Sequence, residues 1–202
     1  MSARRTHGIL GLLLAWSIMS ADVLGQRESE GDRSKREIVI AGRTLYVPDV
    51  WVVTQDGKKV RFYSDLIKDK SVAIGFFFTS CTFVCTWHGE LFSGFQKHLG
   101  SRLGKDIFLI SVSMDPKTDT PARLRDWGAR YGRRSGWTLV TGRTAEMNEL
   151  LQSLTGNTVG PKETHSSFLY IYNRKTGTWS YMLGYPTPTD FEKQIGESRK
   201  TD

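Results

Sequence analysis

The hydrophobic and polar positions predict a domain that opens with short strands. Apolar, β-branched runs broken by turn residues are typical of strands. Near the start of the chain these runs are Ile38–Ile40, Leu45–Val47 and Trp51–Val53. Asp56-Gly57 predicts a hairpin, because glycine accepts the positive φ that such turns need. Val60-Arg61-Phe62 is then the returning strand.

Two longer apolar runs predict the central strands of a sheet. Val72–Phe78 is apolar throughout, and Ile107–Val112 is interrupted only by Ser111. Such runs are typical of strands that are buried on both faces. Near the end of the chain, Phe168–Tyr172 and Trp179–Leu183 predict a second hairpin.

Helical spacing follows the central strands. Trp87, Leu91, Phe95 and Leu99 form an apolar stripe that ends at Gly100. A second helix begins at Pro121, a third centres on Leu150 and ends at Gly156, and a short helix closes the chain. The order is therefore a β-rich start, then βαβα, then ββα. This order predicts an α/β fold with a mixed sheet and a right-handed crossover.

Composition narrows the class of protein. The 202 residues fit one domain plus a leader, and 39% hydrophobic residues are enough for a core. Only two cysteines are present, which excludes a disulfide-rich mini-protein and any four-cysteine zinc or iron–sulfur site. The net charge is +7, but the basic residues are scattered, so no nucleic-acid partner is predicted.

The first residues resemble an export signal. Arg4 and Arg5 precede the apolar run Gly8–Met19, and small residues precede a cleavage position before Gln26. The run is shorter than the roughly 18–20 residues that span a bilayer. We therefore expect residues 1–25 to be a signal peptide, with an uncleaved inner-membrane anchor as the alternative. The expected location is the periplasm, with membrane contact only through an uncleaved leader.

The rest of the chain divides into a tether and one domain. Residues 26–37 contain no apolar residue and predict a flexible polar tether. The folded domain is expected to span residues 38–202.

Cys81 and Cys85 follow the Val72–Phe78 strand directly and precede the Trp87 helix. A cysteine pair in a strand–loop–helix, followed by βα and ββα, is the arrangement of a thioredoxin-like domain. The helix N-terminus favours thiolate over thiol. Three interpretations remain open: a structural disulfide, a redox pair, or a soft-metal site that suits Cu(I) better than zinc.

Three histidines outside the leader are candidates for completing such a site. His88 lies three residues after Cys85, close enough to share a helix face as a ligand or as a group that favours the thiolate. His98 is expected to be a surface residue near the end of that helix. His165 lies in a loop before the Phe168 strand, where functional residues are often presented.

At this point several segments resemble one family. Residues 75–85 resemble the cysteine motif of the Sco/SenC proteins, copper chaperones for cytochrome c oxidase. Residues 111–121, which end in Asp119-Thr120-Pro121, resemble the family's second-strand segment, and residues 137–142 resemble a later strand. His165-Ser166-Ser167 resembles the histidine motif. The likeness runs from about Val47 to Ile195.

The resemblance implies a thioredoxin-like mixed sheet flanked by helices, with an N-terminal β-hairpin extension. It implies that Cys81, Cys85 and His165 bind one copper ion, as Cu(I) or Cu(II), and that Asp115 and Asp119 shape the site or form the turn before Pro121. The expected function is a copper carrier, loaded by an upstream donor, for an apo copper protein such as a cytochrome c oxidase subunit.

The alternative is a thiol–disulfide oxidoreductase. Cys81 and Cys85 would then be its redox pair, acting on the cysteines of a copper-protein partner and served by a thioredoxin-like reductant.

Overall fold

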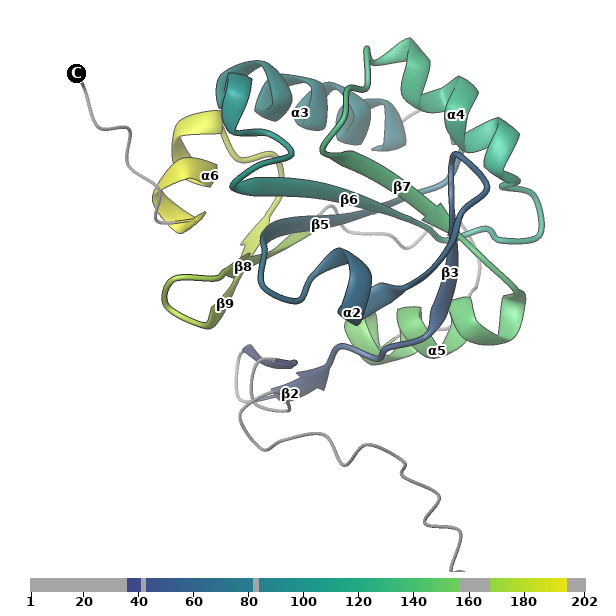
Figure 1. Cartoon of the computed structure of the whole chain (residues 1–202), viewed down its shortest axis with the longest axis horizontal. Coiled ribbons are helices and arrows are strands. Elements are labelled where there is room, and N and C mark those ends of the chain that lie inside the picture. The colour runs from purple at the N-terminus through teal and green to yellow at the C-terminus, as the bar shows by residue number, and fades with distance from the viewer. Residues whose placement is uncertain (1–35, 41–42, 82–83, 157–167, 196–202) are drawn as a thin grey trace, which may run out of the picture.

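The computed structural model describes residues 36–40, 43–81, 84–156 and 168–195. Nine strands are found in this part of the chain: β1 Glu37–Ile40, β2 Arg43–Tyr46, β3 Trp51–Thr54, β4 Lys59–Arg61, β5 Ser71–Phe77, β6 Ile107–Ser113, β7 Trp137–Thr141, β8 Phe168–Asn173 and β9 Thr178–Leu183. The helices are α2 Phe62–Leu66, α3 Val84–Leu99, α4 Pro121–Arg130, α5 Thr144–Thr155 and α6 Pro188–Ile195, with a 3-10 turn at Gly100–Arg102 (Figure 1).

Seven strands form one mixed sheet in the order β4-β3-β7-β6-β5-β8-β9. Strands β5, β6 and β7 are parallel, and the flanking strands pair antiparallel to them. The carboxyl ends of β5 and β6 therefore meet at one edge, where Phe77 pairs with Ser113. Because β8 is antiparallel to β5 and Leu169 pairs with Gly75, β8 begins at this same edge.

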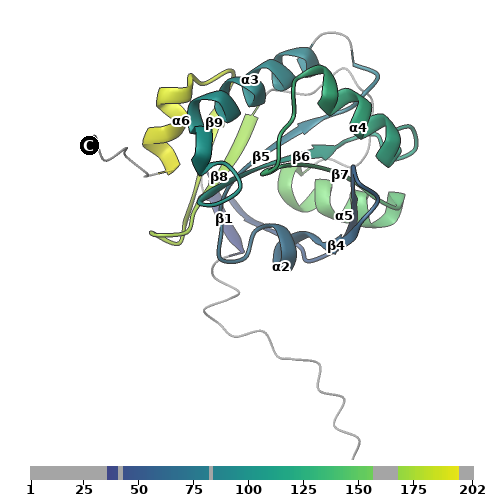
Figure 2. The ribbon, with the colours of Figure 1, turned by 45° about the horizontal axis from the view of Figure 1, so that its top comes forward.

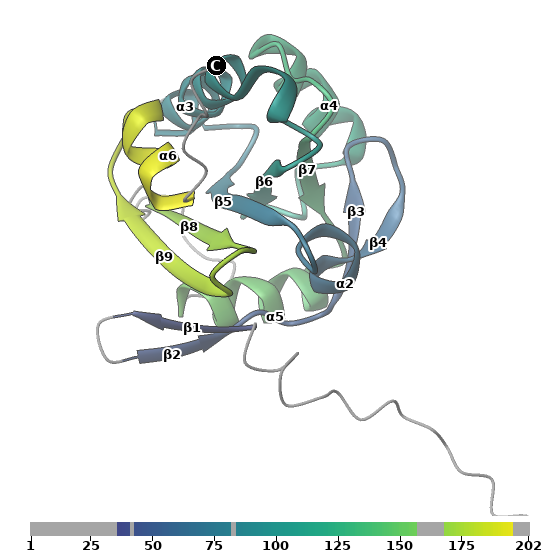
Figure 3. The same cartoon turned by 60° about the vertical axis from the view of Figure 1, so that its left-hand side comes forward.

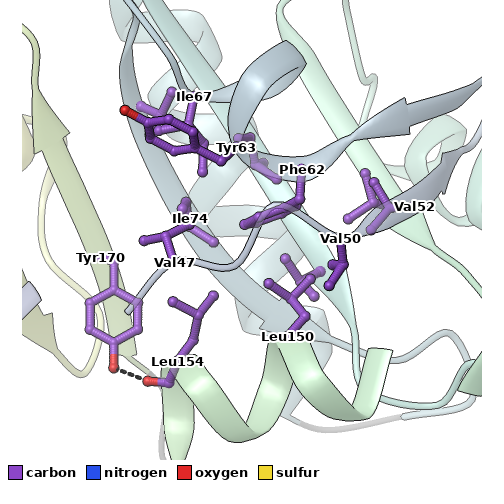
Figure 4. Close-up of a cluster of buried hydrophobic side chains, with 14 of the residues drawn as sticks. Val47, Val50, Val52, Phe62, Tyr63, Ile67, Ile74, Leu150, Leu154 and Tyr170 are labelled. Atoms are coloured by element: carbon purple, nitrogen blue, oxygen red, sulfur yellow. Dashed lines mark hydrogen bonds between the residues drawn. The ribbon is translucent and has the colours of Figure 1, made fainter. Parts of the chain in front are cut away.

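Helices cover both faces of the sheet. Figure 3 shows α3, α4 and α6 on one side, and α5 with the β1–β2 hairpin on the other; Figure 2 shows α3 and α4 across the sheet from α5. Each side has its own apolar core, and the central strands contribute to both. In the α5 core the Tyr170 hydroxyl donates to the Leu154 carbonyl (Figure 4), which satisfies a buried polar group.

The predicted fold class is confirmed. The structure is a mixed α/β sheet flanked by helices with an N-terminal hairpin. The turn at Asp56-Gly57 also forms, with Gly57 at a φ of 78°. One boundary is wrong: Phe62 does not continue the returning strand but begins α2, which the sequence pattern did not indicate.

The apolar face of α3 also differs from the prediction. Trp87 is 54% exposed, whereas Phe92 is fully buried beside Phe95 and Leu99. A strict four-residue spacing advances 400° per step, so it drifts around a helix with 3.6 residues per turn. The buried face instead follows His88, Phe92, Phe95 and Leu99, with alternating steps of four and three.

Candidate metal centre

The cysteine motif occupies the carboxyl edge of the central strand. After β5 ends at Phe77, the chain turns, and the Cys81 amide donates to the Phe78 carbonyl over 3.3 Å. The Cys81 side chain is partly buried against the core beneath α3. Cys85 is the second residue of α3. The backbone thus places one cysteine before the helix and the other in its first turn, where free N–H groups favour a thiolate.

His165 falls outside the described residues. The nearest described position, Phe168, begins β8 at the edge where β5 ends, and its ring lies 5.1 Å from that of Phe76 between centroids. Within the described ranges, no three His, Cys, Asp or Glu side chains gather closely enough to hold a metal ion. The predicted three-residue ligand set therefore remains a prediction.

Asp119 contacts the turn that carries Cys81. Its carboxylate is 1% exposed and accepts hydrogen bonds from the Thr79 amide at 3.2 Å, the Thr79 hydroxyl at 2.5 Å and the Ser113 hydroxyl at 2.6 Å. Burial raises the pKa of Asp119, the hydrogen bonds from Ser113 and Thr79 lower it, and the Asp115 charge raises it further; the net shift is upward.

The turn between β6 and α4 is built by Asp115. Its carbonyl accepts the Thr118 amide at 3.1 Å and the Asp119 amide at 2.8 Å, and its Oδ1 accepts the Thr118 amide at 3.3 Å. The N-cap of α4 is Thr120, whose side chain accepts the Arg123 amide. Asp119 therefore does not cap the helix, and its carboxylate is directed to another part of the chain.

His88 lies in the core between α3 and the sheet, not on the surface beside the cysteine motif. It is 5% exposed, its Nε2 lies 2.8 Å from the Ser111 hydroxyl, and its ring packs on Phe77 and Phe92. Burial lowers its pKa from 6.5 to about 3, so the imidazole is neutral. A Cβ at Gly75 would lie 2.4 Å from its ring, which shows how closely the histidine packs on β5.

His98 is not a simple surface residue. Its Nε2 pairs with the Glu192 carboxylate of α6 at 2.5 Å, and Arg102 binds the other oxygen of that carboxylate. This group ties the end of α3 to α6. His98 stands at the opposite end of α3 from the cysteines, so it takes no part in the motif.

An exposed aromatic pair stands beside the motif. Trp87 on α3 and Tyr185 in the β9–α6 connection are 54% and 48% exposed, and their ring centroids lie 5.5 Å apart. The sequence pattern placed Trp87 on the apolar stripe of α3, and it gave no signal for Tyr185. Thr79 and Ser113 were also missed, because their bonds to Asp119 span 40 and 6 positions and follow no local spacing.

The class of protein that this architecture defines is a thioredoxin-like α/β protein with a cysteine pair after its central strand. Within that class, the profile of the SCO1/SenC family matches residues 43–195. The match covers more than half of the chain, and the chain therefore belongs to the SCO1/SenC family.

Comparison with individual proteins agrees with this assignment. Over 89 residues the chain is 33% identical to the SCO1 protein homolog of Bacillus subtilis (strain 168); the alignment covers 44% of this chain and 45% of that protein. The aligned part of this chain therefore spans less than half the length of that relative.

Solved Sco structures share the fold. BsSco, described with a disulfide switch and as a member of the Sco family of cytochrome c oxidase assembly proteins, gives a TM-score of 0.61 at 23% identity, covering 76% of this chain and 95% of that chain. Bradyrhizobium japonicum ScoI, solved with copper bound, gives 0.59 at 22% identity, covering 72% and 94%. At these identities the likeness establishes the fold.

Proposed function

We propose that this protein is an exported copper-binding metallochaperone. Cys81, Cys85 and His165 hold one copper ion, as Cu(I) or Cu(II), and the protein delivers it to cytochrome c oxidase or a related copper protein. Two thiolates suit soft Cu(I), and an imidazole is a good ligand for both oxidation states. Copper is the cargo, received from an upstream donor and released by ligand exchange to an apo protein.

The observation that carries this proposal is the meeting of chain segments at one sheet edge. Cys81 follows β5 at its carboxyl end, and β8 begins at the same edge. His165 precedes Phe168 by three positions, a stretch that spans about 10 Å at most when extended. The topology therefore favours a site that combines the cysteine motif with the segment entering β8.

Membership of the SCO1/SenC family supports the proposed copper site. Family membership is established for residues 43–195, which include all three proposed ligands. A structural relative at 22% identity was solved with copper bound. The partly buried Cys81 also fits a carrier, because a metal shielded from water on one side stays exchangeable on the other.

A Cu(I) titration tests the ligand set. The reduced protein is titrated anaerobically against a competing chelator and compared with Cys81→Ser, Cys85→Ser and His165→Ala, with His98→Ala as the control histidine. We expect the first three variants to bind copper more weakly and the control to match wild type. A wild-type affinity no better than that of the double-serine variant would refute the carrier. Loss of binding in His88→Ala but not in His165→Ala would refute the third ligand.

The second candidate function is thiol–disulfide exchange, which the disulfide switch described for BsSco favours. One thiolate of the pair attacks a partner disulfide and the other resolves the mixed disulfide. The partner leaves as a dithiol, and Cys81–Cys85 becomes a disulfide that a thioredoxin-like protein reduces. The test mixes reduced protein with an oxidised dithiol peptide and follows both redox states by alkylation. No exchange at equilibrium would leave copper carriage as the function.

Export rests on the leader. In the part of the chain that the structure describes, no helix is both long and apolar enough to cross a membrane. We propose that residues 1–25 direct the domain to the periplasm, where the polar stretch of residues 26–35 separates it from the membrane if the leader is retained. N-terminal sequencing of the protein from fractionated cells distinguishes a chain that begins at Gln26 from a retained leader.

A further inference from the structure

Asp119 connects the end of β6 to the turn that follows β5. It lies between the end of β6 and the start of α4, yet its carboxylate binds Thr79 in the turn that follows β5. The Ser113 hydroxyl, at the end of β6, donates to the same carboxylate over 2.6 Å. One side chain therefore accepts from both strand ends.

Burying this carboxylate is costly, and the local helix does not require it. A carboxylate that is 1% exposed loses hydration, which hydrogen bonds from neighbouring donors must replace. Thr120 already caps α4, so Asp119 is not needed for that purpose. The strand ends are also joined by the Met114 amide, which donates to the Phe77 carbonyl at 2.8 Å. What the Asp119 carboxylate adds is a set of hydrogen bonds to Thr79, which lies in the turn between β5 and Cys81.

The bound turn leads directly to the first proposed ligand. Thr79 precedes Cys81 by two positions, and the Cys81 amide closes the turn on the Phe78 carbonyl at 3.3 Å. Asp119 holds both the amide and the hydroxyl of Thr79, so the turn has little freedom to rotate. The position of the Cys81 backbone is thus fixed by a residue from a different strand connection.

We infer that Asp119 is a positioning residue for Cys81: it locks the Phe78–Cys81 turn so that the first thiolate is presented in place for copper. This inference rests on the proposed copper function. Residues that orient metal ligands through hydrogen bonds usually change affinity by about 10- to 100-fold when replaced. Asn in place of Asp119 keeps the size of the side chain but has one oxygen acceptor instead of two. Three donors from Thr79 and Ser113 then compete for that oxygen, so the turn is held less firmly.

Two measurements on full-length Asp119→Asn test the inference, with Asp126→Asn on the exposed side of α4 as the matched control. First, the Cu(I) dissociation constant should rise by about 10-fold or more in Asp119→Asn and stay at the wild-type value in the control. Second, in a Cys85→Ser background, where Cys81 is the only thiol, alkylation by iodoacetamide without copper should be several-fold faster in Asp119→Asn. Circular dichroism establishes that each variant is folded.

Thr79→Val keeps the test decisive if Asp119→Asn does not fold, because it removes one donor and leaves the carboxylate. Thr79→Val should raise the Cu(I) dissociation constant and the alkylation rate by smaller factors than Asp119→Asn. The double variant should show a smaller effect than the two single effects combined, because both changes disrupt the same contact. Folded variants with wild-type affinity and alkylation rate, or a control that changes equally, would overturn the inference. A wild-type protein that binds no copper would refute the proposed function, while the alkylation rate would still test Asp119.

Discussion

His88 gives the protein a dependence of stability on pH. The imidazole is neutral in the fold because burial lowers its pKa to about 3, whereas the unfolded chain titrates it near 6.5. Between these values the unfolded state binds the extra proton, so the free energy of unfolding falls as the pH falls. This contribution is fully present above pH 6.5 and decreases by about 1.4 kcal/mol for each pH unit below it.

Urea unfolding at pH 7 and pH 5 measures this effect. In His88→Gln the titrating group is gone, and the loss of stability between the two pH values should shrink by about 2 kcal/mol relative to wild type. Gln152→Ala, a change at an exposed and uncharged position of α5, is the control and should retain the wild-type dependence on pH. An unchanged pH slope in His88→Gln would show that another group is responsible.

Single positions were predictable from the sequence where the signal is local. Cys81 and Cys85 follow a buried strand and precede a helix, and both features lie within a few residues. The family resemblance implied that Asp119 shapes the site, but its contact with Thr79 was not predictable, because the two residues lie 40 positions apart. The exposure of Trp87 was also missed, since aromatic character alone does not say which face of a helix turns inward.

At the scale of elements, α2 shows why one boundary was wrong. Val60-Arg61-Phe62 has the alternation of a strand, but the chain enters a helix at Phe62. The Arg61 N-cap has no side-chain hydrogen bond to the helix. The Asp49 carboxylate instead accepts the Tyr63 amide at 3.0 Å and the Ser64 amide at 2.9 Å. A cap supplied from 14 and 15 positions away leaves no signature in the local sequence.

Replacing Asp49 tests this account of α2. Asp49→Ala leaves two helix amides without their acceptor and should lower the free energy of unfolding by about 1 kcal/mol, in the range of other N-cap losses. Asp49→Asn keeps one acceptor and should lose less. Asp106→Asn, at an exposed turn position, is the control and should change little. Equal stability of Asp49→Ala and wild type in urea unfolding would mean that packing of Phe62 and Tyr63 alone fixes the helix.

At the scale of the molecule, the order of elements was readable because each central strand is apolar on both faces and each helix has one apolar stripe. The α/β class follows from that order, whereas the hairpin extension was implied by the family resemblance. The pairing of β3 with β7 and of β8 with β5 did not follow, because these contacts join segments that are far apart in sequence. The sheet edge where Cys81 and the start of β8 meet is a product of those pairings.

The start of the folded domain can be located by experiment. The family profile starts at residue 43, but β1 lies before it and pairs along its length with β2. Ile38 is fully buried, and the Arg36 guanidinium donates to the Val47 carbonyl at 2.7 Å and lies over the Tyr46 ring at 4.4 Å. β1 also lies against β9, at the edge of the main sheet. These contacts place β1 inside the domain. Arg36 and Glu37, which were predicted to belong to the tether, are therefore part of the folded unit.

Two shortened chains test that boundary. A chain that begins at Arg36 retains all of these contacts and should unfold at the same urea concentration as the full-length protein. A chain that begins at Arg43 loses β1 and the burial of Ile38, which alone contributes about 1.5–3 kcal/mol, so its midpoint should fall clearly. The Ile38→Ala variant of the longer chain should show part of the same loss, because it removes the buried side chain but keeps the strand pairing. If the chain from Arg43 were as stable as the chain from Arg36, the domain would begin after the first strand, and β1 would be an attachment whose burial does not contribute to folding.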